Sequence, residues 1–391
     1  CLFNILQIYK LKTYFWEMNW DNSKAHQKIK QKLKESIDNN RISHAQLFAG
    51  KNGWGTLELA IEYAAEIMAS EKGEIAKKKV LELQHPDVHF SFPVISTSDN
   101  SKPVSADYFK EWRTFIMENP YASLNDWLVH LKAEKKRGTI NVHEATEIIK
   151  FSSMRSYEGS YKIIIIWLPE NMGIEASNKI LKSLEEPGDK TVFLLVTENE
   201  NVLLPTIISR CQLVKLNRLS NQEIKDFLVN EKGVNQIEAD KIAKSSNGDL
   251  NLAIKNLEAD DDSFDSYFVE LVRNAFRARK SPAELSDLIR WSDVLSGWSR
   301  EKQRFFLIFC SEIFRQALMD NYQAKSLNYL EIKVDGFKWE GFSPYIHGAN
   351  IEEILDEINQ AIFHIERNAN AKIVFLDLSI KLTRLIHKKA A

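Results

Sequence analysis

Residues 162–196 read KIIIIWLPENMGIEASNKILKSLEEPGDKTVFLLV, and this stretch decides the fold class. The four isoleucines at 163–166 are β-branched without interruption, which is typical of a strand buried on both faces of a parallel sheet. The apolar run at 192–196 has the same character. Between the two runs, apolar residues recur at helical spacing until Pro187 ends the helix. A strand, a helix and a second strand in this order predict a βαβ unit, and therefore an α/β domain.

The alternation of helix and strand extends outward from this unit. Further helices and strands are expected at 23–39, 45–49, 57–69 and 88–92. Beyond residue 217 the strand signals nearly vanish, and a capping box formed by Ser220 and Glu223 opens a run of helices. We therefore predict three parts: an α/β domain at 18–217, a small three-helix domain at 218–260 and a larger helical domain at 261–391.

The composition is that of a globular protein with packed cores. The chain has 391 residues, which suits two or three domains, and 44% of them are hydrophobic while 27% are charged. Glycine (14) and proline (9) are scarce, which excludes collagen-like, low-complexity and long disordered chains. A net charge of -2 argues against a histone-like or polybasic partner surface.

Cysteine spacing and hydropathy indicate in which cellular compartment the protein is expected. Cys1, Cys211 and Cys310 lie far apart, which excludes a cysteine zinc site and a disulfide framework and favours the reducing cytoplasm. No run of about 18 apolar residues is present, so we expect no membrane-spanning helix. Residues 1–17 lack the features of a signal peptide. They are interpreted as a non-native or upstream extension before Met18, although the alternative that they are native stays open.

Two segments carry a family resemblance. The first, residues 42–57, reads ISHAQLFAGKNGWGTL, and the second, residues 176–187, reads ASNKILKSLEEP. A strand follows the second segment, and then residues 204–211 read LPTIISRC. This order resembles the clamp-loader branch of the AAA+ ATPases. The resemblance implies a RecA-like parallel-sheet domain, a small helical lid and a helical collar domain that joins subunits into a ring; residues 367–370 look like part of that collar.

The phosphate-binding loop of these ATPases is degenerate in this chain. Such a loop needs glycines so that its amides can surround phosphates, a lysine that reaches them and a hydroxyl for Mg²⁺. Gly50, Gly53 and Gly55 keep the glycine frame, but Thr56 stands at the lysine position and Leu57 at the hydroxyl position.

Two further sets of residues that contact nucleotide or metal in the related ATPases are replaced in this chain. Where the related ATPases carry Asp-Glu after the strand, this chain has Trp167 and Leu168, with Glu170 further on. Asn251 replaces the arginine that these relatives often place in the lid. Without a lysine, a hydroxyl or an acid, charge on a transferred phosphoryl group has no stabiliser. We therefore expect no ATPase activity, no metal and no bound cofactor, while residual nucleotide binding by the loop amides stays open.

This pattern resembles the delta-prime family of the bacterial DNA polymerase III clamp loader. The resemblance implies a stator whose Arg210 acts in trans on ATP held by the neighbouring subunit, with Ser209 and Cys211 fixing the turn that presents it. A guanidinium suits that role because it stays protonated and forks onto phosphate oxygens. The four-cysteine zinc module of many relatives is absent. The implied partners are the gamma/tau motor subunits, the delta subunit and, through the complex, the sliding clamp and primer-template DNA, with no membrane.

Two other functions stay open, an active AAA+ motor ATPase with an unorthodox loop and a diverged AAA+ scaffold. Basic runs at 77–79, 132–137 and 387–389 are typical of solvated helix faces, although DNA contact is an alternative. The insert at 96–136 has no function that the sequence indicates.

Overall fold

The computed structural model describes residues 26–134, 136–159, 161–258, 264–278, 285–298, 300–322, 332 and 334–389. The extension predicted at 1–17 lies outside these residues. The chain divides into two compact units, residues 1–256 and 257–391. The finer boundary predicted between residues 217 and 218 stays a prediction.

The first unit is built on a five-stranded sheet with the strand order β2-β3-β4-β1-β5. Every pair of neighbouring strands is parallel, and the βαβ unit predicted from residues 162–196 is present as β3, α8 and β4. The strands are β1 (Ala45–Ala49), β2 (Val88–Ser91), β3 (Lys162–Trp167), β4 (Thr191–Thr197) and β5 (Gln212–Lys215).

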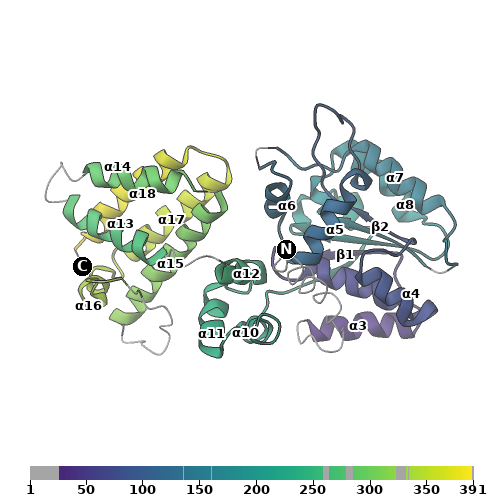
Figure 1. The fold of residues 1–391 in the computed structure, drawn as a ribbon, viewed down its shortest axis with the longest axis horizontal. Helices are drawn as coiled ribbons and strands as arrows, with labels where there is room; N and C mark the ends of the chain where they lie inside the picture. The colour runs from purple at the N-terminus through teal and green to yellow at the C-terminus, as the bar shows by residue number, and fades with distance from the viewer. Residues whose placement is uncertain are drawn as a thin grey trace, which may run out of the picture. The chain divides into compact units, whose positions relative to one another are not determined.

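Helices cover both faces of this sheet, so its central strands have no exposed side (Figure 1). Ile163 and Ile165 belong to the core that includes α4, whereas Ile164 and Ile166 belong to the core that includes α7 and α8. Successive side chains of a strand point to opposite faces, and the isoleucine run supplies both cores. The helices are α3 (Gln27–Asp38), α4 (Thr56–Leu81), α5 (Phe109–Glu118), α6 (Leu124–His130), α7 (Val142–Ser153) and α8 (Ile174–Glu185).

Short helices complete the first unit. The predicted capping box is confirmed, because Ser220 Oγ accepts from the Glu223 amide at 3.2 Å and Glu223 Oε2 accepts from the Ser220 amide at 2.7 Å. We call the three helices that follow this box the lid. The elements are η1 (Ser105–Tyr108), η2 (Pro169–Asn171), η3 (Glu200–Val202), α9 (Pro205–Ile208) and the lid helices α10 (Asn221–Asn230), α11 (Gln236–Ser245) and α12 (Leu250–Glu258).

The sequence did not predict β5 or the helices α5, α6 and α7. β5 is a four-residue strand at the edge of the sheet, and three of its four residues are exposed, so it lacks an apolar run. The helices α5 and α6 lie within the insert, whose aromatic residues pack on the end of β2 in a stack of Phe92 on Trp112 with ring centroids 4.5 Å apart.

The regular elements that the structure describes in the second unit are all helices. α15 packs on α17, and α18 packs on both α14 and α17, around a core that contains Trp291, Phe306 and Phe375 (Figure 1). Its elements are α13 (Phe264–Ala278), α14 (Leu285–Ser296), α15 (Arg300–Asn321), α16 (Trp339–Phe342), η6 (Ser343–Tyr345), α17 (Ile351–Glu366) and α18 (Ala371–Ile386). The predicted fold class, an α/β part followed by helical parts, is confirmed.

None of the described helices has the length and apolar content needed to cross a membrane.

Candidate functional site

The carboxyl ends of three neighbouring strands bring the predicted loop residues together. Ala49 at the end of β1 pairs with Thr197 at the end of β4, and Trp167 at the end of β3 pairs with Val196. Because the strands are parallel, the segments that follow them lie at one edge of the sheet. One cavity at this edge is lined by Gly50, Gly53, Gly55, Thr56, Leu57, Trp167, Leu168 and Thr197, among others.

The glycine frame of the loop is required by its backbone. Gly53 and Gly55 have φ values of 73° and 79°, in the left-handed region that side chains disfavour. The Gly50 amide donates to the Thr197 carbonyl at 3.1 Å, which fixes the start of the loop to the end of β4. Two positions of the loop therefore favour glycine, and α4 begins directly after it at Thr56.

The space inside this loop is nearly full. The cavity has a volume of about 20 Å³, which is enough for a water molecule, whereas ligand pockets measure several hundred Å³. The apolar side chains of Leu57 and Leu168 are buried beside it, at 3% and 2% exposed. Thr56 Oγ1 is buried and has no hydrogen-bond partner among the residues that the structure describes, and Lys51 is exposed where it lines the cavity.

The remaining acid after β3 faces a different direction. Glu170 Oε1 accepts from the Glu198 amide at 2.8 Å, at the end of β4, and Glu170 is not among the residues that line the cavity. Burial raises the pKa of the Glu170 carboxyl. Thr197 caps the strand end, because its Oγ1 accepts from the Asn199 amide at 3.2 Å. Both side chains thus hold the segment that follows β4 through its backbone amides.

The lid helix α12 begins directly on the loop. The Leu250 amide donates to the Gly53 carbonyl at 3.0 Å, and a Cβ atom on Gly53 would collide with the Asp249 carboxylate. Asp249 Oδ1 accepts from the Leu252 amide at 2.9 Å, which caps the first turn of α12. Gly53 is therefore needed both for its left-handed backbone and for the close approach of the lid.

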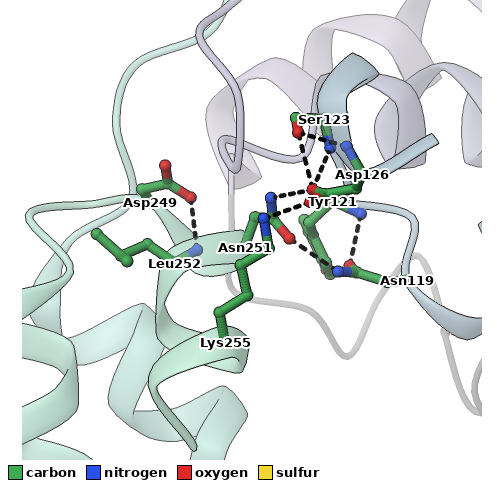
Figure 2. A network of polar contacts seen from close by, with 8 residues as sticks. All are labelled: Asn119, Tyr121, Ser123, Asp126, Asp249, Asn251, Leu252 and Lys255. Carbon is green, nitrogen blue, oxygen red and sulfur yellow. Dashed lines mark hydrogen bonds and ion pairs between the residues drawn. The ribbon is translucent and has the colours of Figure 1, made fainter. Parts of the chain in front are cut away.

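Asn251, which we expect at the position of the lid arginine, binds the insert (Figure 2). Its Nδ2 donates to Asp126 Oδ2 at 2.9 Å, and its Oδ1 accepts from Asn119 Nδ2 at 2.8 Å. Asn251 is only 1% exposed, so both ends of its amide are satisfied by this segment. The insert that the sequence left without a function therefore binds the lid.

Asp126 is the centre of this network. Its Oδ2 also accepts from the Ser123 amide and hydroxyl, both at 2.8 Å, and its Oδ1 forms an ion pair with Lys255 of α12 (Figure 2). Burial disfavours the charged carboxylate, but the Lys255 charge and these hydrogen bonds outweigh it and lower the pKa of Asp126. We call Asn119, Asp126, Asn251 and Lys255 the lid latch. The Ser-x-x-Asp capping box at 123–126 is the sequence signal that could have placed Asp126.

A buried acidic pair lies beneath the loop on α4. Glu58 Oε2 lies close to the Gly55 Cα, and burial, followed by the charge of Glu62, raises the pKa of Glu58 to about 8. Lys30 of α3 pairs with Glu62 at 2.7 Å. Tyr121 of the insert hydrogen-bonds Glu58 and meets the Phe227 ring of the lid edge-on at 5.8 Å. Glu58 therefore lies where loop, insert and lid meet, a role that one glutamate in a helical pattern does not signal.

Arg210 lies apart from the loop cavity, in the turn between α9 and β5. Its Nε donates to Glu185 Oε1 at 2.6 Å, its Nη1 donates to the Thr206 carbonyl at 2.8 Å, and its side chain is 29% exposed. Ser209 Oγ donates to the same carbonyl at 3.2 Å. Burial raises the pKa of the Cys211 thiol to about 11, so it stays protonated at neutral pH.

Residues 25–220, half of the chain, match the family model described as DNA polymerase III, delta subunit. The chain belongs to this family. The resemblance to the delta-prime family that the LEEP and Ser-Arg-Cys segments indicate is thereby confirmed.

Several relatives of this chain are named as DNA polymerase III subunits. DNA polymerase III subunit delta' of Bacillus subtilis (strain 168) is 29% identical over 52% of this chain and 51% of the relative. Subunit tau of the same organism is 25% identical over 54% of this chain and 31% of the relative. A gamma subunit-related protein of Thermotoga maritima aligns with 91% of this chain and 99% of its own, at a TM-score of 0.39 and 14% identity. By sequence, the chain spans about half the length of the Bacillus subtilis delta' subunit. It spans a smaller share of the other two relatives, delta' of Pseudomonas aeruginosa and tau of Bacillus subtilis.

Proposed function

We propose that this chain is a subunit of the DNA polymerase III clamp loader that does not hydrolyse ATP and that supplies Arg210 to ATP bound by a neighbouring subunit. The neighbour would be a gamma/tau-type motor subunit, and delta would complete the ring that loads the sliding clamp onto primed DNA. The membership of the delta subunit family and the delta', tau and gamma relatives support this assignment.

The observation that carries the proposal is the closed loop. A phosphoryl-transfer site needs space for the triphosphate, a cation and a metal ligand. Here about 20 Å³ is open, Thr56 and Leu57 stand at the positions of the lysine and the hydroxyl, and Leu250 of the lid donates to Gly53 within the loop. These features support a subunit that has kept the architecture of an ATPase without its chemistry.

The location of Arg210 supports action on a partner. The guanidinium is partly exposed, and Arg210 does not line the cavity of its own loop. The turn that carries it is anchored by the core, since Ile207 and Leu203 are buried next to Leu184 of α8. A fork of donors on a rigid turn is suited to a phosphate held by another chain, because little conformational entropy is lost on contact.

Reconstitution of the complex tests this proposal. Motor subunits, delta and this chain are combined, and ATP hydrolysis stimulated by clamp and DNA is compared for wild type, Arg210→Ala and Arg210→Lys. We expect the isolated chain to be inactive and both variants to assemble normally. Hydrolysis should fall at least about tenfold with Arg210→Ala, because an arginine finger stabilises charge in the transition state. Arg210→Lys should recover little, because lysine lacks the fork.

The other outcomes separate the alternative functions. Equal hydrolysis by wild type and Arg210→Ala complexes contradicts the finger. Turnover of ATP by the isolated chain at the rate of a motor subunit indicates an active ATPase. Failure to join the motor subunits and delta in size-exclusion chromatography favours a diverged scaffold.

A further inference from the structure

The guanidinium of Arg210 is occupied by acceptors from its own chain. Nε and Nη2 both donate to Glu185 Oε1, and Nη1 donates to the Thr206 carbonyl and, at 3.4 Å, to Ser209 Oγ. The two donors turned to Glu185 form one edge of the guanidinium, which is an edge that an anion would take in a bidentate contact. The Arg210 guanidinium thus lies against acceptors of its own chain.

The fold, rather than a chance encounter of long side chains, brings these two residues together. Glu185 is the last residue of α8, and Arg210 follows α9 by two positions. α8 packs on α9, with Ile180 and Leu184 of one helix in the same core as Ile207 of the other. Both ends of the pair are therefore anchored, and the pair forms at a fixed separation across 25 residues of sequence.

We propose that Glu185 is a positioning residue that holds Arg210 retracted until the phosphate of a neighbouring subunit displaces the carboxylate. This inference rests on the proposed function and adds a step that regulates when Arg210 is available. The carboxylate and a phosphate oxygen compete for the same donors, so Glu185 lowers the affinity of Arg210 for other anions. Both side chains are partly exposed, at 29% and 45%, so the competition is modest and a phosphate can win it.

The chain supplies a matched control at the next position. Glu186 belongs to the same LEEP segment, is exposed like Glu185 and carries the same charge. Among the hydrogen bonds and ion pairs in the described part of the chain, those of Arg210 go to Glu185, Thr206 and Ser209. Glu185→Gln and Glu186→Gln therefore change the net charge equally, and only the first removes the negative charge that is paired with Arg210.

The first measurement uses the chain by itself. The rate at which phenylglyoxal modifies Arg210 is followed by mass spectrometry of the peptide that carries it. We expect Glu185→Gln to raise this rate about two- to fivefold, since an exposed ion pair is worth that much, and Glu186→Gln to leave it unchanged. Equal rates in wild type and Glu185→Gln, or an equal rise in both variants, overturn the proposal.

The second measurement uses the reconstituted complex. We expect Glu185→Gln to raise kcat/KM for ATP about two- to fivefold, whereas a purely structural role would lower it. A kcat/KM that is unchanged or reduced while Glu186→Gln matches wild type overturns the retraction. If the Arg210→Ala complex keeps full activity, the proposed function fails, and the modification rates still decide whether Glu185 holds Arg210. The two failures are therefore distinguishable.

Discussion

Asn251 of the lid donates from Nδ2 to Asp126 Oδ2 of the insert at 2.9 Å, across 125 residues of sequence. The sequence places Asn251 where the related ATPases often carry a phosphate-binding arginine. The structure gives this position a contact within the chain itself. The lid is thus bound by side chains to the insert of the same unit.

The lid latch should stabilise the first unit. Asp126→Ala removes the acceptor for Asn251 and Ser123 and leaves the Lys255 ammonium without this partner. Because the network is largely buried, we expect a loss of about 2–4 kcal/mol in the free energy of unfolding, measured by urea denaturation. Hydrogen exchange in α12 should accelerate as well.

The matched control for the latch is Asp240→Ala, which removes a carboxylate paired with Lys244 on an exposed face of the lid. We expect it to change the free energy of unfolding by less than about 1 kcal/mol. Similar losses for both variants would show that the latch has no special contribution.

Gly53→Ala should separate the lid from the loop. Alanine at φ 73° is strained, and its Cβ collides with the Asp249 carboxylate. We expect a loss of at least about 2 kcal/mol in the free energy of unfolding. Gly233→Ala has a similar φ of 67° and no atom near its Cβ, so it reports the backbone strain by itself. A Gly53→Ala variant no less stable than Gly233→Ala would contradict the close approach.

The isolated chain should not bind ATP at physiological concentration. We expect a Kd weaker than about 1 mM by isothermal titration calorimetry, because the cavity at the loop has a volume of only about 20 Å³. The double variant Thr56→Lys with Leu57→Thr restores the loop residues but not the space that Leu168 and Tyr121 occupy, so it should bind no better. A micromolar Kd for wild type would contradict the closed loop.

The stability of the first unit should fall as pH rises from about 4.5 to about 8. Burial raises the pKa of Glu58 from its ordinary 4.5 to about 8, so in this window the folded chain keeps a proton that the unfolded chain releases. Glu58→Gln has no such proton to keep. It should match wild type near pH 5 and be more stable by about 3–4 kcal/mol at pH 8.

Urea denaturation at pH 5, 6, 7 and 8 measures this difference, with the exposed Glu35→Gln as the control for loss of a carboxylate. A constant difference between wild type and Glu58→Gln across the series would mean that Glu58 ionises normally in the folded chain.

Local sequence determined much of the fold. The isoleucine run at 163–166, the helix before Pro187 and the capping box at Ser220 all appear as predicted, because each depends on residues within a few positions. The degenerate phosphate loop inferred from Thr56 and Leu57 stays a prediction. The edge strand β5 was not predicted, because its mostly exposed residues carry no apolar pattern.

Only the tertiary structure decided what replaces the lost chemistry. The residues that line the loop cavity, the bond from Asn251 to Asp126 and the bond from Arg210 to Glu185 each join segments that are 25 or more residues apart. Periodicity reports which face of an element is buried, but not which distant polar group will meet it there. Those pairings depend on how parallel strands align their carboxyl ends and where the lid and the insert then pack.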